Sequence, residues 1–222
     1  MGKCINNIFT LLYFHFVNEK LFFLTAFSFF LGFISKELLN TEELVINSLA
    51  EQLTTKQIEK ALNFQQKWEW IAYLLLPLLL IIKISIIALI LDVGCFFFDK
   101  EIKYKKLFNI VTKADFVFLG VMILKTIWFY VFQQDYTLEN LQYFYPLSAL
   151  NIVGYEGLQT WFIYPFQVIN LFEFAYWFIL ASLISKELKT TTSKGFSIVA
   201  SSYGVALLIW VVGVMFFTLN MS

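Results

Sequence analysis

Three ionisable side chains lie where a lipid environment makes an isolated charge costly. Glu173, Lys83 and Lys125 each fall near the middle of a different long apolar segment. Charged groups at such a depth are usually buried against one another or against water. The sequence therefore predicts a polar centre inside a polytopic membrane protein.

Two neutral polar residues accompany the carboxylate of this centre. Gln167 and Asn170 precede Glu173 at intervals of three residues, so on one helix the three side chains would face a common interior. Three uses are open for the centre. It could be a closed clasp between Lys and Glu, a site that binds or transports an anionic ligand, or a set of side chains that extend to the membrane surface. Contact between opposite charges would favour the clasp.

The composition of the chain places it in lipid. Hydrophobic residues make up 59% and aromatic residues 20% of the 222 residues, and the mean hydropathy is +0.73. A soluble domain of this length cannot bury that much apolar surface. The 16 basic residues, all lysines, balance the 16 acidic residues, so no global basic character points to nucleic acid. The sequence predicts an all-α membrane protein whose first partner is the lipid bilayer.

Apolar segments of about the length of a membrane span occur five times, which predicts a bundle of five transmembrane helices. They cover residues 21–35, 71–91, 116–132, 161–184 and 196–219. Pro77 and Pro165 fall inside the second and fourth segments, where each is expected to kink its helix and free a carbonyl group.

The lysines predict how the bundle is oriented, because cytoplasmic loops are enriched in basic residues. Residues 99–115 hold five lysines and the connection at residues 186–194 holds three, whereas residues 133–160 hold none. The N-terminal segment 1–20 is then cytoplasmic or interfacial, and the C-terminus is exterior. The expected location is the inner membrane of the cell. Asp115, at the edge of the first basic loop, is expected to pair with the lysines of that loop.

Residues 36–70 are predicted to form an exterior hairpin of two short helices. Thr54 followed by Gln57 is a capping-box start, and Ile58, Ala61 and Leu62 follow at helical spacing. The hairpin could rest on the membrane surface, or it could be a docking surface for a protein partner.

Small residues in the last apolar segment favour close helix packing. Ser197, Ala200, Ser201 and Gly204 recur at helical spacing, and small side chains let helices approach closely in membranes. A protein partner or a second copy of the chain is expected to bind through this stripe or through the exterior hairpin.

Signatures of enzymes and metal sites are sparse. His15 is the single histidine, which excludes multi-histidine metal centres and leaves no obvious base for a Ser or Cys nucleophile. No phosphate-binding loop, dinucleotide-binding glycine pattern or Cys-x-x-Cys pair occurs. Cys4 and Cys95 lie near predicted cytoplasmic ends, where thiols stay reduced. We expect no catalytic residue, no metal and no cofactor.

One block of the sequence resembles a known family. Residues 146–173, which read PLSALNIVGYEGLQTWFIYPFQVINLFE, are similar to the stretch that enters the fourth span of bacterial Yip1-like membrane proteins. The similarity extends from about residue 71 onward. It implies a five-helix bundle with a cytoplasmic N-terminus and a short exterior C-terminus. Eukaryotic relatives are associated with membrane trafficking and small GTPases, but this chain lacks their long cytoplasmic N-terminal region.

These observations predict a non-enzymatic membrane scaffold or an accessory subunit of a membrane complex. A small transporter that works through Lys83, Lys125 and Glu173 is the alternative. An intramembrane enzyme is a third possibility, and it would need a nucleophile and a base in one cavity at Glu173.

Overall fold

The described part of the chain is built from helices. The computed structural model describes residues 19–50 and 53–221, and within these residues the chain forms helices and no strand. The all-α class is therefore confirmed. The predicted N-terminal segment 1–20 lies outside the described residues except for its last two, and so do Cys4 and His15.

The predicted exterior hairpin differs from the structure at its second helix. Helix α2 (Glu19–Leu38) contains the first predicted span, and α3 (Thr41–Ala50) follows it after a turn. Helix α4 (Thr55–Phe97) then continues for 43 residues. The Thr54 N–H donates to the Gln57 side chain at 3.0 Å, so the predicted helix start is confirmed. The predicted second helix is the first part of α4, because no Gly or Pro interrupts residues 55–70.

The predicted basic loop at residues 99–115 is mostly helix. Helix α5 (Tyr104–Asp115) leads into α6 (Val117–Ile127) and then into a π-helix, η1 (Trp128–Phe132). Helix α5 is amphipathic, since its apolar residues are buried while Lys105 and Lys106 are exposed. An apolar stripe with charges opposite suits a helix that packs on a core. The number of lysines in this segment indicated a loop, because a count of charges does not show that they lie on one face of a helix.

The predicted fourth span, residues 161–184, is not one continuous helix. After the short helices α7 (Leu138–Tyr143) and α8 (Leu150–Val153), α9 (Thr160–Val168) ends before α10 (Leu171–Leu188) begins. The strand-like pair Ser148 and Asn170 lies at the break. The Ala149 N–H donates to the carbonyl of Ile169 at 2.8 Å, so the preceding loop satisfies a carbonyl that the break leaves free.

The last segment is helical throughout but contains a second π-helix. Helix α11 (Thr192–Val199) continues into η2 (Ala200–Gly204) and α12 (Val205–Met221). Single π-helical turns within α-helices are rare and are frequent at functional sites.

Four helical stretches within the described residues are long and apolar enough to cross a membrane. They are Glu19–Leu38, Thr55–Phe97, Tyr104–Phe132 and Thr192–Met221. Helix α10 is not among them; it is 18 residues long and carries Glu173, Lys186 and Glu187. The structure thus supports a multi-pass membrane protein.

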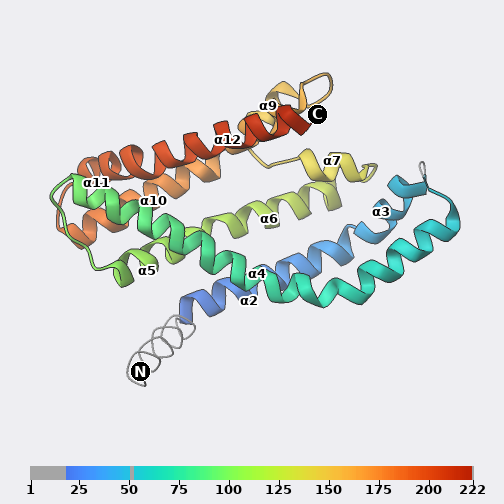
Figure 1. Cartoon of the computed structure of the whole chain (residues 1–222), viewed down its shortest axis with the longest axis horizontal. Coiled ribbons are helices and arrows are strands. Elements are labelled where there is room, and N and C mark those ends of the chain that lie inside the picture. Colours follow the sequence, from blue (N-terminus) through green and yellow to red (C-terminus); the bar gives the residue numbers. More distant parts are fainter. Residues whose placement is uncertain (1–18, 51–52, 222) are drawn as a thin grey trace.

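The core lies where α4, α5, α10 and α11 meet. Figure 1 shows these helices packed along one another, and the pairs α10 with α11 and α4 with α5 make extensive contacts. Ile84, Leu91, Val111, Leu180 and Ile184 are among the side chains with no measurable exposure. This core positions the polar residues described below.

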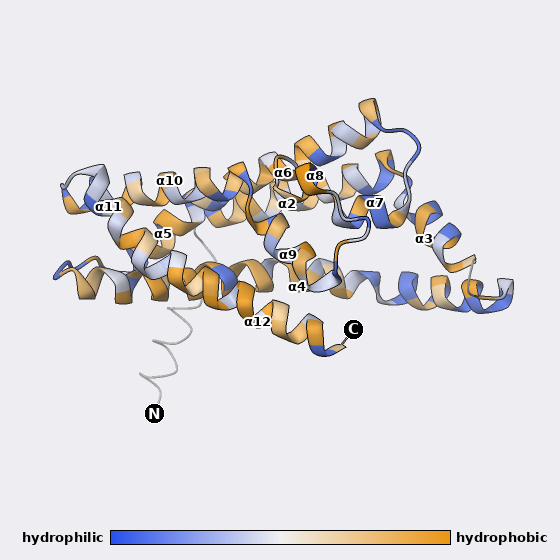
Figure 2. Ribbon diagram, turned by 90° about the horizontal axis from the view of Figure 1, so that it is seen from above, coloured by the Kyte–Doolittle hydropathy of each residue, from blue (hydrophilic) through white to orange (hydrophobic). Residues whose placement is uncertain are grey.

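The two ends of the molecule are polar and its middle is apolar. Figure 2 shows hydrophilic residues on α3, α7 and the first turns of α4 at one end, and on α11 at the other. Between them, apolar side chains such as Leu79, Phe178 and Leu208 are more than half exposed. An exposed apolar belt between polar ends is the pattern expected for helices surrounded by lipid. The connections from α4 to α5 and from α10 to α11 lie at the same end (Figure 1).

Candidate functional site

Lys83 pairs with Asp115, a residue that was expected to pair elsewhere. The Lys83 ammonium lies 3.0 Å from Oδ2 and 3.1 Å from Oδ1 of Asp115. The Asp115 side chain is only 2% exposed, whereas that of Lys83 is 43% exposed. The ammonium also lies 4.5 Å from the centre of the Phe118 ring, in the geometry of a cation–π contact. The expected pairing of Asp115 with the lysines of residues 99–115 is therefore wrong.

The pair forms deep within the bundle because α4 and α5 are antiparallel. At 1.5 Å per residue, Lys83 is about 21 Å from the end of α4 at Phe97, and Asp115 is about 17 Å from the start of α5 at Tyr104. Both distances begin at the same short connection. The two charges therefore lie at a similar distance from this end of the bundle.

Glu173 is held by two neutral donors rather than by a lysine. Its Oε1 accepts hydrogen bonds from the Tyr203 hydroxyl at 2.8 Å and from the Trp177 indole N–H at 3.0 Å. Trp177 comes from the next turn of α10, and Tyr203 comes from the π-helix η2. The wider turn of η2 places Tyr203, which is 7% exposed, against the carboxylate. Hydrogen bonds to an ionised carboxylate are stronger than hydrogen bonds between neutral groups.

Gln167, Asn170 and Glu173 do not line one helical face, because the break after α9 separates them. Asn170 is the N-cap of α10, and its side-chain oxygen accepts from the Glu173 N–H at 2.8 Å. Its amide group donates to the carbonyls of Gln167 and Val168. Gln167 donates to the Tyr143 carbonyl at 3.0 Å. These two residues hold the helix break in place. The Asn-x-x-Glu spacing of residues 170–173 is typical of a helix start, so the sequence did contain a signal for the start of α10.

Tyr176 lies near both carboxylates. Its side chain has no measurable exposure, and its hydroxyl has no hydrogen-bond partner of acceptable geometry in the described part of the chain. The hydroxyl nevertheless lies close to Asp115, Glu173 and Tyr203. The residues Lys83, Asp115, Tyr176, Glu173 and Tyr203 thus form one continuous polar cluster in the core.

Lys125 lies outside this cluster. It is about 15 Å further along the same helical stretch than Asp115, and no ion pair to it occurs among residues 19–50 and 53–221. The structure therefore does not bring Lys125 to Lys83 and Glu173. Helix α4 and the stretch Tyr104–Phe132 run in opposite directions from their shared connection. Asp115 lies level with Lys83, whereas Lys125 lies further from that connection.

The predicted small-residue stripe makes one close contact within the chain. Within the chain, Ser197 and Ser201 are exposed and Ala200 is half-buried. Gly204 makes the close contact, because a Cβ there would lie 2.5 Å from Cη2 of Trp177. Two further close approaches lie at positions that the sequence reading did not select, Gly94 against Ser202 and Gly195 against Ser185.

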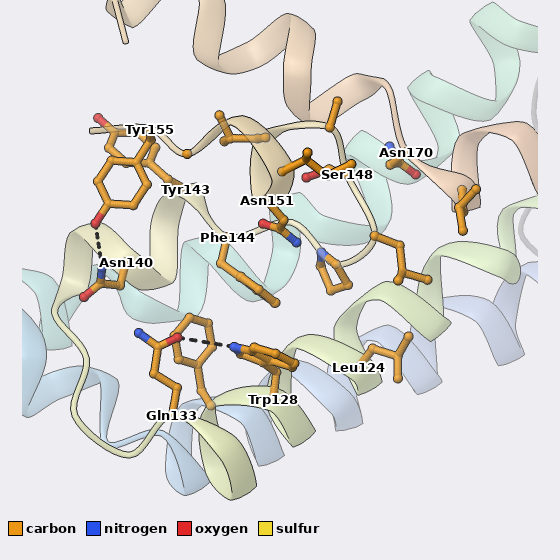
Figure 3. A pocket seen from close by; sticks show the side chains of 18 of the residues that line it. Leu124, Trp128, Gln133, Asn140, Tyr143, Phe144, Ser148, Asn151, Tyr155 and Asn170 are labelled. Carbon is orange, nitrogen blue, oxygen red and sulfur yellow. Dashed lines mark hydrogen bonds between the residues drawn. The ribbon is translucent and has the colours of Figure 1, made fainter. Parts of the chain in front are cut away.

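A cavity of about 890 Å³ lies beside the helix break (Figure 3). Its walls come from the end of α6 and η1, from residues 140–155 and from the first turn of α10. Aromatic side chains dominate one wall, where the Trp128 and Phe144 rings stack at 5.5 Å. The sequence reading missed this cavity, since it is formed by loops and by residues distant in the chain.

Two tyrosines beside the cavity are neutral. Burial raises the pKa of Tyr145 to about 12, with Glu173 adding to the shift. Burial likewise raises the pKa of Tyr155, whose hydroxyl accepts from the Asn140 amide. Both phenols are therefore uncharged at neutral pH. Among the residues the structure describes, no three His, Cys, Asp or Glu side chains are grouped to hold a metal ion.

Comparison with known proteins adds no relative. No family model matches the chain, and no curated protein or solved structure matches it. The resemblance to bacterial Yip1-like proteins stays a prediction.

Proposed function

We propose that this chain is a non-enzymatic scaffold or accessory subunit of a membrane complex in the inner membrane. It would cross the bilayer five times, with α10 as the fourth span, the N-terminus in the cytoplasm and the C-terminus outside. Supporting this topology, the two lysine-containing connections lie at one end of the bundle and the C-terminus lies at the other (Figure 1). Basic connections favour the cytoplasmic side.

The observation that carries the proposal is the length of α4. Its 43 residues extend for about 65 Å, roughly twice the thickness of the hydrocarbon layer. If the apolar residues 71–91 cross the membrane, residues 55–70 project from it by about 24 Å. We call these residues together with α3 the exterior arm.

The exterior arm is fastened to the bundle at its base. The Lys36 ammonium, at the end of α2, lies 2.8 Å from Glu42 of α3 and 2.7 Å from Glu69 of α4. The Tyr136 hydroxyl donates to the Leu39 carbonyl at 3.0 Å. An element held at its base presents its outer part in a fixed orientation, which lowers the entropic cost of binding a partner.

Next to its base, the arm exposes two aromatic rings. Phe64 is 66% and Trp68 is 43% exposed, and their rings lie 6.1 Å apart. Lys60 and Lys67 flank them. Aromatic residues surrounded by polar ones are typical of protein interfaces. We infer that this pair contacts the partner subunit, while Trp70 lies at the membrane surface.

The polar cluster favours a scaffold over the transporter alternative. Lys83 and Glu173, two of the three residues on which transport would depend, each have partners within 3.1 Å in the core. A transport site needs groups that can exchange partners with a ligand. The pairing of Lys83 with Asp115 is the geometry expected of an internal clasp.

The test is the size of the native complex. Chain solubilised from its own membranes should elute with a partner in fixed stoichiometry, well above its mass of 26.0 kDa plus detergent. Phe64→Ser should release it from the complex without lowering its amount in the membrane. Phe96→Ser, at the other end of α4 and 76% exposed, is the matched control and should leave the complex intact. A lone monomer from native membranes, or equal behaviour of the two variants, would contradict the proposal.

A further inference from the structure

The cavity beside the helix break has a chemistry of its own. Among the described residues that line it, none is an Asp, Glu or Lys. Its volume of about 890 Å³ falls within the range of small-molecule sites, which are largely apolar with a few placed polar groups. The absence of charge on the walls disfavours an ionised ligand, because burying an unpaired charge is costly.

One buried polar group in the cavity wall is left without a partner. Ser148 is 2% exposed, and its hydroxyl makes no hydrogen bond within the described part of the chain. The hydroxyl belongs to a residue that lines the cavity, as Figure 3 shows. Buried hydroxyls in proteins are nearly always hydrogen-bonded. An acceptor supplied by a ligand would satisfy it.

Neighbouring polar groups on the wall are already occupied. The Asn170 side chain bonds to three backbone groups, and the Asn140 amide donates to Tyr155. The Trp128 N–H donates to the Gln133 side chain at 3.3 Å (Figure 3). Ser148 is thus the buried hydroxyl from which a ligand could accept a hydrogen bond.

The cavity opens toward apolar surroundings. Several wall residues are apolar and more than half exposed, among them Leu147, Ile152 and Leu171. The cavity also adjoins the end of the Tyr104–Phe132 stretch, one of the candidate spans. A hydrocarbon chain from the bilayer could enter it without crossing water.

We propose that this cavity binds an uncharged lipid from the surrounding bilayer. Its hydrocarbon chain lies against the aromatic wall of Trp128 and Phe144, and an ester carbonyl accepts a hydrogen bond from Ser148. Diacylglycerol has this chemistry, with long chains and a head of ester and hydroxyl groups. The inference is independent of the scaffold proposal, since it does not involve the exterior arm.

Photolabelling tests the inference on the full chain. The protein is placed in phosphatidylcholine nanodiscs with a small fraction of diacylglycerol that carries a diazirine in one chain. After illumination, labelled peptides are mapped by mass spectrometry. We expect saturable labelling of peptides within residues 124–155 and 169–174. Excess unlabelled diacylglycerol should suppress it, and anionic phosphatidylglycerol should not.

Two variants and one control sharpen the test. Ile127→Trp fills the cavity from α6 and should lower the saturable labelling by at least about fivefold, equivalent to a modest loss of binding free energy. Ile123→Trp is one turn earlier on the same helix, equally exposed (43% against 45%) and outside the cavity lining, so it should change labelling by less than about twofold. Ser148→Ala removes one neutral hydrogen bond and should weaken apparent affinity about fivefold.

Several results would overturn the inference. Labelling spread evenly over α12 and α4 without saturation would show ordinary contact with surrounding lipid. Equal competition by phosphatidylglycerol would contradict an uncharged ligand. If Ile127→Trp misfolds, as judged by circular dichroism and elution, Ser148→Ala decides alone: unchanged affinity refutes the proposed hydrogen bond.

Discussion

Removing Lys83 should destabilise the protein, because the buried Asp115 carboxylate then loses the donor of its two hydrogen bonds and cannot replace it with water. The Asp115 side chain is 2% exposed and accepts two hydrogen bonds from Lys83, at 3.0 and 3.1 Å. Breaking a buried ion pair from one side costs about 3–5 kcal/mol. In Lys83→Met, the Tyr176 hydroxyl could turn toward Asp115 and recover about 1 kcal/mol. The expected loss of unfolding free energy is therefore about 2–4 kcal/mol.

The reverse substitution should cost less. In Asp115→Asn a carbonyl oxygen remains as an acceptor, and the Lys83 side chain, 43% exposed, keeps its contact with the Phe118 ring. We expect a loss of about 1–2 kcal/mol. The double variant holds no unpaired buried carboxylate, so its loss should fall short of the sum of the two by at least about 1.5 kcal/mol.

The assay is reversible unfolding of the purified chain in mixed dodecyl maltoside and dodecyl sulfate micelles, followed by tryptophan fluorescence. Lys60→Met, an exposed lysine on the same helix, controls for the general effect of losing a charge and should change stability by less than about 0.5 kcal/mol. Equal losses in Lys83→Met and Lys60→Met, or strict additivity in the double variant, would refute the buried-pair reasoning.

Three further predictions concern packing, the Glu173 bonds and orientation. Gly204→Ala should destabilise the chain by about 1–3 kcal/mol in the same micelle assay, because its Cβ would lie 2.5 Å from Trp177. Tyr203→Phe should cost about 1.5–3 kcal/mol, because it removes the 2.8 Å hydrogen bond to the Glu173 carboxylate. On intact cells, in a chain with Cys4 and Cys95 replaced by serine, an impermeant maleimide should label Glu139→Cys and leave Lys103→Cys unlabelled, as the positive-inside rule requires.

Control substitutions at Gly213 and Tyr130 separate the loss of a specific contact from the general effect of changing a glycine or a tyrosine. At Gly213 an added Cβ would meet nothing within 4 Å, so Gly213→Ala should stabilise helix α12 slightly; a loss equal to that of Gly204→Ala would point to the backbone and away from the Trp177 contact. Tyr130 is 56% exposed, and Tyr130→Phe should be neutral. Labelling of Lys103→Cys on intact cells would reverse the proposed topology.

Much of the architecture could be predicted because it depends on local properties of the chain. The apolar residues 71–91 and 196–219 fall inside helices that are long enough to cross a membrane. Thr54 and Gln57 begin a helix as their spacing indicates. The predictions failed where a helix continued past a polar region, as in α4 and α5, since charged residues on one face of a helix resemble a loop when only their number is counted.

The partners within the site could not be read from the chain. Lys83 and Glu173 both lie in the polar cluster, but Asp115 and Tyr203, which bond to them, were not among the predicted members. Asp115 ends an amphipathic segment and looked like a surface residue. Tyr203 is one of 11 tyrosines, and a π-helix that no sequence rule indicated turns it toward the core.

The sequence by itself determined that this chain has the composition of a membrane protein, which segments are helical and apolar, and which side chains carry charge inside apolar segments. These are properties of single residues and short windows, and their free energies of transfer add along the chain. Only the tertiary structure decided that Lys83 meets Asp115, that Lys125 stands apart and that a neutral cavity forms beside the break before α10. Such contacts depend on the lengths, directions and rotations of helices that pack far apart in sequence, and a one-residue change in any of these turns a side chain toward a different neighbour.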